Sequence, residues 1–233
     1  MKTAIMQPYI FPYIGYFQLI HAVDEFVFLD NVNFIKRGWV NRNCILINDE
    51  KKMITFPCNK ISQNKLIQNT EIDMTSKEYS KLIRTIKLAY RKAPYYNEVI
   101  PIIEKTLQSN FKTISELAIF SVKSVANYLQ INTKFRISSI EFNEVKNAMP
   151  SDQLIQICKA LNSKKYINAI GGQKLYEKEY FYKNSVDLYF LKPEINSYKQ
   201  YNKEFVGGLS IIDVLMFNDV QTIQAMLKNY SLI

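Results

Sequence analysis

The sequence TAIMQPYIFPYIGYFQLIHAV, residues 3–23, decides the fold of this 233-residue chain. Its first four residues form a run too short and too rich in β-formers for a helix, so they predict a strand. Pro8 and Pro12 each remove a backbone donor and fix φ, so a loop must follow that strand. From Tyr13 onward the apolar residues recur with a period near 3.6, which predicts a helix that begins after Pro12.

A second predicted strand follows directly. The run DEFVFL at residues 24–29 is apolar and β-prone, and Asp30 and Asn31 end it. Strand, loop, helix and strand in this order predict a parallel β-α-β unit. In such units ligands bind beyond the carboxyl ends of the strands, where helix N-termini offer free N–H groups to anions. We therefore expect a ligand site built from residues 7–16 and 30–43.

The segment that follows the second strand, DNVNFIKRGWVNRN at residues 30–43, has the composition of a binding surface. Lys36, Arg37 and Arg42 supply three cations, and Trp39 supplies a large flat face. Four asparagines add amide donors and acceptors. The segment predicts recognition of phosphate or carboxylate, and the alternative is a solvated basic loop whose tryptophan packs on the core.

The rest of the chain predicts a hairpin, a helical middle segment and a further alternation of strands and helices. Two β-prone runs, at 44–48 and 53–56, predict a hairpin with a four-residue loop over 48–51. We expect helices at 75–91, 97–109, 113–129, 151–161, 173–182, 210–217 and 220–229, and strands at 134–142, 166–170 and 186–191.

The predicted fold class is therefore α/β. We expect a Rossmann-like sheet with a parallel β-α-β N-terminal unit, a β-hairpin insertion and a helical middle segment. Residues 1–233 are predicted to form a single domain, with 75–130 as a helical elaboration.

Two further motifs have a structural and a functional interpretation. Gly171 and Gly172 lie between a predicted strand and a predicted helix, where a backbone can approach a phosphate, although such pairs are more often tight connections. Ser210 and Asp213 form a Ser-x-x-Asp box, and we favour helix capping over catalysis for them. A serine nucleophile needs a base, and His21, the one histidine of the chain, lies among apolar residues. A Ser-His-Asp hydrolase is not expected.

Composition excludes several other classes. No window approaches a membrane span and the N-terminus lacks a signal-peptide pattern, so we expect a cytoplasmic protein without a transmembrane segment. Three widely spaced cysteines and one histidine argue against a disulfide framework and against a metal site.

The charge balance points to anionic partners. The chain has 30 Lys and Arg against 21 Asp and Glu, a net charge of +9. The positive charge is scattered along the sequence, which argues against nucleic acid as the partner. Nucleotides, nucleotide-linked amino sugars, an anionic lipid-linked glycan or another anionic small molecule also fit this charge.

Several separated motifs resemble the WbqC-like family, bacterial proteins associated with O-antigen and other surface-polysaccharide gene clusters. The motifs are MQPYIFPYIGYFQLI (6–20), VDEFVFLDNVNFIKRGWVNRN (23–43), AYRKAPYY (89–96), KYI (165–167) before the glycine pair, Tyr198-x-Gln200, Phe205 and LSIID (209–213). The resemblance implies a role in glycan assembly, with a glycine transferase proposed for some members. One departure is visible, because many members carry Asp-Asp-Val-Gln-Phe where this chain has DNVNF at 30–34.

A more distant likeness concerns residues 13–16. Tyr13-Ile14-Gly15-Tyr16 stands where nucleotidyl-transferring α/β enzymes carry His-Ile-Gly-His, and the following strand is similar to that of pantothenate-synthetase-like ligases. This likeness implies a nucleotide at residues 7–16, with ATP as the candidate. Tyrosine can donate a hydrogen bond but cannot replace a cationic imidazolium.

These observations predict an enzyme that transfers an amino-acid or acyl group to a nucleotide-linked amino sugar, and the family resemblance makes glycine one candidate for that group. Asp30 is the candidate general base. The candidate substrate-binding or nucleotide-binding residues are Gln7, Tyr13, Gly15, Tyr16, Asn33, Lys36, Arg37, Trp39, Asn41, Arg42, Gly171, Gly172, Tyr198 and Gln200. The alternatives are a glycosyltransferase that uses a nucleotide sugar and a noncatalytic assembly factor that binds a glycan or nucleic acid.

Overall fold

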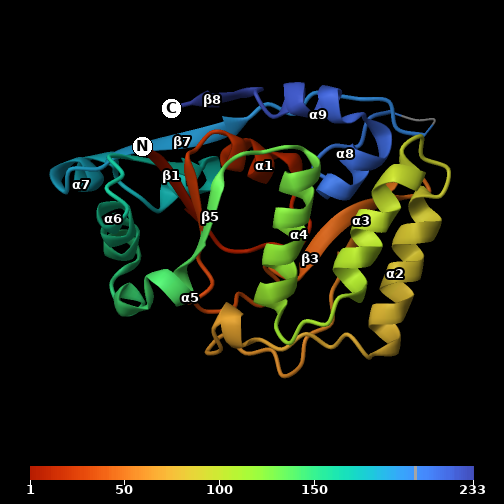
Figure 1. Cartoon of the computed structure of the whole chain (residues 1–233), viewed down its shortest axis with the longest axis horizontal. Helices are drawn as coiled ribbons and strands as arrows, with labels where there is room; N and C mark the ends of the chain where they lie inside the picture. Colours follow the sequence, from red (N-terminus) through yellow and green to blue (C-terminus); the bar gives the residue numbers. More distant parts are fainter. Residues whose placement is uncertain (202–203) are drawn as a thin grey trace.

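The computed structural model describes residues 1–201 and 204–233, and within them a six-stranded sheet runs in the order β5-β2-β1-β6-β7-β8 (Figure 1). The strands are β1 (Lys2–Met6), β2 (Glu25–Phe28), β5 (Lys134–Ile137), β6 (Lys165–Ala169), β7 (Asp187–Pro193) and β8 (Tyr230–Leu232). Neighbouring strands pair in parallel except β7 and β8, which are antiparallel. The α/β class, the parallel N-terminal unit and the separate hairpin of β3 (Arg42–Ile47) and β4 (Glu50–Thr55) are confirmed.

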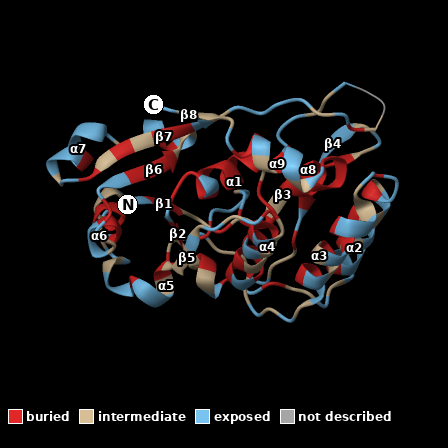
Figure 2. Cartoon of the chain, turned by 45° about the horizontal axis from the view of Figure 1, so that its top comes forward, coloured by how far each residue is buried: buried red, intermediate tan, exposed pale blue. Residues whose placement is uncertain are grey.

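The first helix, α1 (Ile14–His21), joins β1 to β2 and is buried along almost its whole length (Figure 2). The buried Gln18 donates through Nε2 to the carbonyl oxygens of Glu194, Met226 and Asn229 at 3.2, 2.9 and 2.8 Å. Its buried Oε1 has no hydrogen-bond partner among the described residues, although most buried polar atoms have one. The same three bonds tie the C-terminal segment to the helix that starts the fold.

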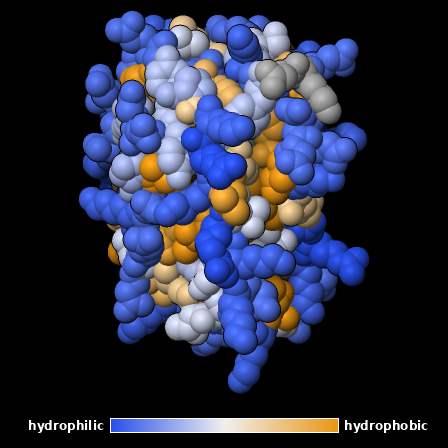
Figure 3. Space-filling model, turned by 90° about the vertical axis from the view of Figure 1, so that its right-hand side faces the viewer, coloured by the Kyte–Doolittle hydropathy of each residue, from blue (hydrophilic) through white to orange (hydrophobic). Residues whose placement is uncertain are grey.

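The middle of the chain is helical, as predicted, with α2 (Lys77–Tyr90), α3 (Tyr96–Gln108) and α4 (Ile114–Tyr128) grouped on one side of the molecule (Figure 1). Figure 3 looks onto the side that carries α2 and α3, where hydrophilic side chains cover most of the surface and apolar surface appears in patches between them. The remaining helices are η1 (Ile67–Asn69), α5 (Ser138–Glu141), η2 (Asn143–Val145), α6 (Pro150–Ala160), η3 (Ile170–Lys174), α7 (Lys178–Lys183), α8 (Ile211–Phe217) and α9 (Val220–Met226). None of the described helices is long and apolar enough to cross a membrane.

Four predicted elements differ from the structure. The strand expected over 134–142 ends at Ile137, because the next residues turn into α5. The helix expected over 173–182 is divided between η3 and α7. The hairpin loop is shorter than predicted, since Asn48 and Asp49 both take positive φ and form a two-residue turn. The last helix ends at Met226, and the antiparallel β8 follows it.

Candidate ligand-binding site

A cavity of about 300 Å³ lies beyond the carboxyl ends of the parallel strands, and we call it the aromatic pocket. Its walls come from the segments after β1, β2 and β7, from the β3–β4 hairpin and from the residues before α8. The lining residues are Tyr9, Pro12, Tyr13, Trp39, Arg42, Asn43, Lys51, Ile195 and Gly208. The structure thus brings together the two segments that the sequence predicts to form a site.

The aromatic pocket combines three aromatic rings with two cations. Tyr9, Tyr13 and Trp39 supply the rings, and Arg42 and Lys51 the positive charges. Among the described residues that line the pocket, none is acidic. Burial raises the pKa of Tyr9 and of Tyr13, so both hydroxyls stay protonated at neutral pH. The pocket therefore offers flat apolar faces and hydrogen-bond donors to an anionic ligand.

Asn43 lines the aromatic pocket and binds the backbone of the loop after β1. Its Nδ2 donates to the carbonyl oxygens of Ile10 and Phe11 at 3.2 and 2.5 Å, and Phe11 has a φ of 42°. A non-glycine residue in this region is disfavoured unless its surroundings fix it. Asn43 therefore fixes the loop between Pro8 and Pro12 in a conformation that the backbone alone would not prefer.

Gly15 and Tyr16 act beneath the pocket rather than in its lining. A Cβ at Gly15 would lie 2.3 Å from Cε2 of Tyr13, so glycine leaves the space that the Tyr13 ring occupies. The buried Tyr16 donates through its hydroxyl to the carbonyl oxygen of Gln7 at 2.8 Å. The structure places these predicted residues around Tyr13, while Gln7 follows β1 and is half-buried.

A second cavity, of about 540 Å³, adjoins Arg42 and collects the other predicted cations. Lys36, Arg37, Asn41 and Arg42 line it together with Phe34, Thr55 and Ile61. We call it the basic cavity. Arg42 borders both cavities, and its Nη1 donates to the carbonyl oxygen of Arg37 at 2.7 Å. A ligand with an aromatic end and a phosphate end could occupy the aromatic pocket and the basic cavity together.

Two predicted asparagines have different environments. The buried Asn41 donates through Nδ2 to the carbonyl oxygen of Phe56 at 2.8 Å, so its amide holds the end of the hairpin. Asn33 is exposed and its backbone forms a bridge with Leu66.

Asp30 lies at a third cavity, of about 650 Å³, and does not line the aromatic pocket. Its Oδ1 accepts from Ser139 N at 3.0 Å and Ser138 Oγ at 3.3 Å, and its Oδ2 accepts from Ser139 Oγ at 2.8 Å and Ser115 Oγ at 3.2 Å. Ser138 shares its hydroxyl with Oδ1 of Asn31, at 2.6 Å. A carboxylate has about four acceptor positions, so these contacts occupy all of them. Asp30 can take a proton only when one contact is released.

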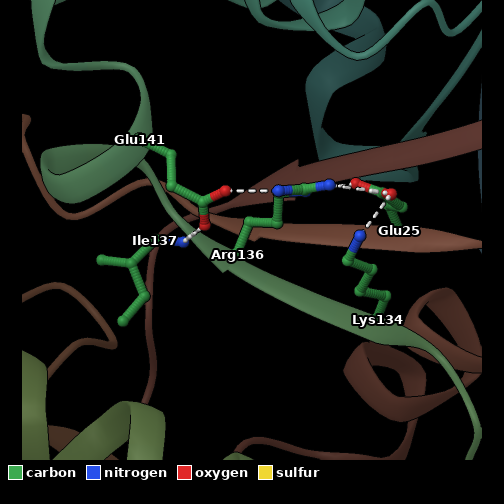
Figure 4. Close-up of polar contacts among 5 residues, drawn as sticks. All are labelled: Glu25, Lys134, Arg136, Ile137 and Glu141. Carbon is green, nitrogen blue, oxygen red and sulfur yellow. Dashed lines mark hydrogen bonds and ion pairs between the residues drawn. The ribbon is translucent and has the colours of Figure 1, made fainter.

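A charged cluster at the edge of the sheet holds the segment that carries Ser138 and Ser139 (Figure 4). Arg136 on β5 binds Glu25 on β2 through two nitrogens, at 2.5 and 3.2 Å, and also binds Glu141 on α5. Lys134 adds a contact to Glu25 at 3.6 Å. The hydrogen bond from Arg136 holds the pKa of Glu25 below its usual value. The cluster ties β5 and α5 to β2, and so aligns the start of α5 with Asp30.

Tyr198 and Gln200 meet at a buried carboxylate that the sequence does not identify as such. Asp213 accepts from Tyr198 Oη at 2.6 Å, from Gln200 Nε2 at 2.7 Å and from Tyr90 Oη at 3.0 Å. The expected cap is confirmed for Ser210, whose Oγ accepts from Ile212 N at 3.3 Å, but it is wrong for Asp213. The available signal was an acid inside the otherwise apolar run IIDVLMF, residues 211–217.

The glycine pair shows two environments. Gly172 is buried, and a Cβ there would lie 2.4 Å from Nδ2 of Asn168, so this glycine permits close packing. At Gly171 an added Cβ meets nothing within 4 Å. The pair lies after β6, next to the end of β1, and lines none of the three cavities described above.

The fold and the cavities define an α/β protein whose candidate site is assembled at the carboxyl ends of parallel strands. The sequence model of the WbqC-like protein family matches residues 7–225, and the chain belongs to this family. The uncharacterized protein Rv1507c of Mycobacterium tuberculosis is 28% identical over 222 residues, which cover 93% of each chain. No solved structure matches this chain significantly.

Proposed function

We propose that the aromatic pocket binds a nucleotide-linked amino sugar, and that the protein is a transferase of surface-polysaccharide, or O-antigen, biosynthesis. The reaction would move an amino-acid or acyl group, with glycine as one candidate, onto the amino group of that sugar. Membership of the WbqC-like family supports the pathway. The observation that carries the proposal is the union of three aromatic rings and two cations at the strand ends.

The two cavities suit the two ends of such a ligand. Ligand pockets usually measure about 300–1,000 Å³, so the aromatic pocket matches one base or one sugar rather than a whole nucleotide sugar. Aromatic faces stack on either group. Arg42 lies between this pocket and the basic cavity, where Lys36 and Arg37 add charge for phosphates.

The transfer requires an activated carboxyl group. The sugar nitrogen attacks the carbonyl carbon, a C–N bond forms, the activating group leaves, and the nitrogen loses a proton. An acyl adenylate made from ATP is one such activated group. Asp30 is our candidate for the proton acceptor. Because Asp30 borders the third cavity and does not line the aromatic pocket, this role requires the release of a serine contact and a sugar amino group that reaches the third cavity.

Trp39 provides a direct test, because it is the only tryptophan and it lines the pocket. Its emission is followed while nucleotide-linked amino sugars, ATP and glycine are added, with excitation where nucleotides do not absorb and confirmation by calorimetry. We expect saturable binding of the nucleotide sugar. Saturation by ATP as well would support activation on this protein, and silence with every ligand would contradict the proposal.

Arg42→Ala tests the phosphate contact. Charge-assisted hydrogen bonds are each worth about 1.5–3 kcal/mol, so affinity for the nucleotide sugar should fall at least about tenfold. Arg84→Ala, at an exposed position of α2, is the matched control and should bind normally. Equal affinity in the Arg42 variant and the wild type would remove Arg42 from the site.

A further inference from the structure

An exposed loop carries apolar and basic side chains side by side. It consists of Ile35, Lys36, Arg37, Gly38 and Trp39, and we call it the IKRGW loop. Ile35 is 54% exposed and Trp39 is 52% exposed, although both are large apolar residues. The flanking residues Phe34 and Val40 are each only 1% exposed. The loop is therefore anchored at both ends in the core and presents its middle to solvent.

The conformation of the loop is fixed. Gly38 N donates to the carbonyl oxygen of Ile35 at 3.0 Å, and a Cβ at Gly38 would lie 2.9 Å from that oxygen. Arg37 has a φ of 61°, and the carbonyl oxygen of Arg37 accepts a hydrogen bond from Nη1 of Arg42. Since such a φ is disfavoured for a non-glycine residue, these contacts keep the turn in place.

The IKRGW loop also lies within a segment of the sequence whose charged residues are all positive. Residues 31–48 contain three cations, Lys36, Arg37 and Arg42, and no acidic residue. The whole chain has a net charge of +9, so its field favours the approach of a negative surface.

We propose that the IKRGW loop docks the protein onto an anionic lipid surface. Tryptophan and isoleucine enter the boundary between headgroups and acyl chains, while Lys36 and Arg37 remain at the lipid phosphates. Two apolar side chains and two cations give a weak, reversible and salt-sensitive association. This docking goes beyond the proposed reaction and does not depend on it.

Ile35, the aliphatic residue of the IKRGW loop, favours a lipid bilayer over nucleic acid as the partner. Binding to single-stranded nucleic acid pairs cations with aromatic rings on which bases stack, and Ile35 offers no such face. At a lipid interface an exposed isoleucine beside a tryptophan gains from burial. Because Trp39 also lines the aromatic pocket, docking would bring the pocket to the membrane surface.

The test uses the full chain and two kinds of vesicle, an equal mixture of phosphatidylglycerol and phosphatidylcholine, and phosphatidylcholine alone. We expect the protein to sediment with the anionic vesicles at low salt and not with the neutral ones. Trp39 emission should shift to the blue on binding and be quenched by brominated acyl chains. This readout reports insertion at the loop itself.

Matched variants separate the loop from the overall charge. Lys36→Glu with Arg37→Glu should lower vesicle partitioning at least about tenfold, since each basic residue near an anionic surface contributes roughly a fivefold factor. Lys77→Glu with Lys81→Glu makes the same charge change on α2 and should have a much smaller effect. Ile35→Ser should lower partitioning, whereas Leu88→Ser, at a residue 65% exposed on α2, should not.

Three results would overturn the docking proposal. They are no sedimentation with anionic vesicles, equal losses in the α2 and loop variants, and a Trp39 shift that occurs with an oligonucleotide but not with lipid. The last result would assign the loop to nucleic acid. The nucleotide-sugar titration is done without lipid, so either proposal can fail while the other stands.

Discussion

Asp30 and Asp213 are both buried carboxylates, yet their surroundings differ in kind. Asp30, at the end of β2, is 3% exposed, borders a cavity and receives contacts from three serines. Asp213, within α8, is fully buried and receives contacts from two tyrosines and a glutamine. Serine hydroxyls beside a cavity can rotate toward water, whereas large side chains packed in a core cannot. We therefore expect the free energy of unfolding to depend more on Asp213, whose partners are large packed side chains, than on Asp30, whose partners are serines.

The two carboxylates also connect different parts of the chain. Asp30 joins the end of β2 to the starts of α4 and α5. Asp213 joins the end of α2 to the segment that carries Tyr198 and Gln200, and Gln200 in turn binds both backbone groups of Val206. Since Ile195 and Gly208, near the two ends of that segment, line the aromatic pocket, Asp213 supports a wall of the site that it does not touch.

The largest difference between the two carboxylates is expected in the free energy of unfolding, and Asp213→Ala tests it. We expect a loss of about 3 kcal/mol in the free energy of unfolding, because the buried Tyr90 and Gln200 and the half-buried Tyr198 lose their acceptor. Denaturant unfolding measures this loss. Asp219→Ala is the control, since Asp219 is an exposed cap of α9 that accepts from Thr222 N at 2.7 Å, and its removal should cost about 1 kcal/mol. Equal losses in the two variants would show that burial of Asp213 contributes nothing.

A smaller effect on stability is expected for Asp30→Asn. The amide keeps one acceptor oxygen and the serine hydroxyls can turn to accept from its nitrogen, so the loss should be about 1 kcal/mol. Turnover decides the catalytic role, which stays a prediction. General acid–base catalysis contributes about a hundredfold or more, so a fall of that size with ligand affinity unchanged assigns Asp30 as the base. A fall below about tenfold removes it from the reaction.

The smallest effect concerns pH. Burial raises the pKa of Asp213 above its model-compound value of 3.8, so folding favours its protonated form. The part of the stability that depends on protonation of Asp213 is then fully present below pH 3.8 and is lost as pH rises through the raised pKa, while the three hydrogen bonds to the carboxylate remain. The stability difference between wild type and Asp213→Asn should therefore shrink with rising pH and then level off. A difference that grows over this interval would show that the three donors outweigh burial.

The N-terminal unit was predictable because its signals are local. Pro8 and Pro12 end one strand, and the periodic apolar residues that follow give the helix. The cations after β2 were likewise predicted to share a site, and the structure gathers them around Arg42. The prediction of a shared site required only that parallel strands place their carboxyl ends at the same edge of the sheet.

The remaining elements depend on contacts that sequence does not reveal. Ser138 and Ser139 continue a β-prone run but start α5, where Asp30, 109 positions before Ser139, accepts from the Ser139 backbone. The three residues of β8 carry no strand pattern of their own and pair only because β7 is there. Tyr198 and Gln200 were predicted to contact a sugar, and their bonds to Asp213 join residues 13 to 15 positions apart without a helical or strand period.

The position of β1 in the sheet has a consequence for how the chain is made. Among the described strands of the sheet, β1 is the first to leave the ribosome, yet it lies between β2 and β6 (Figure 1). Its second partner begins at Lys165, so about 160 residues must be added first, which takes roughly 8 to 30 seconds at about 5–20 residues per second. Until then one side of β1 offers unpaired backbone groups, and such an edge invites pairing with another chain. Of the strands that end with a partner on each side, β1 thus waits the longest for its second partner.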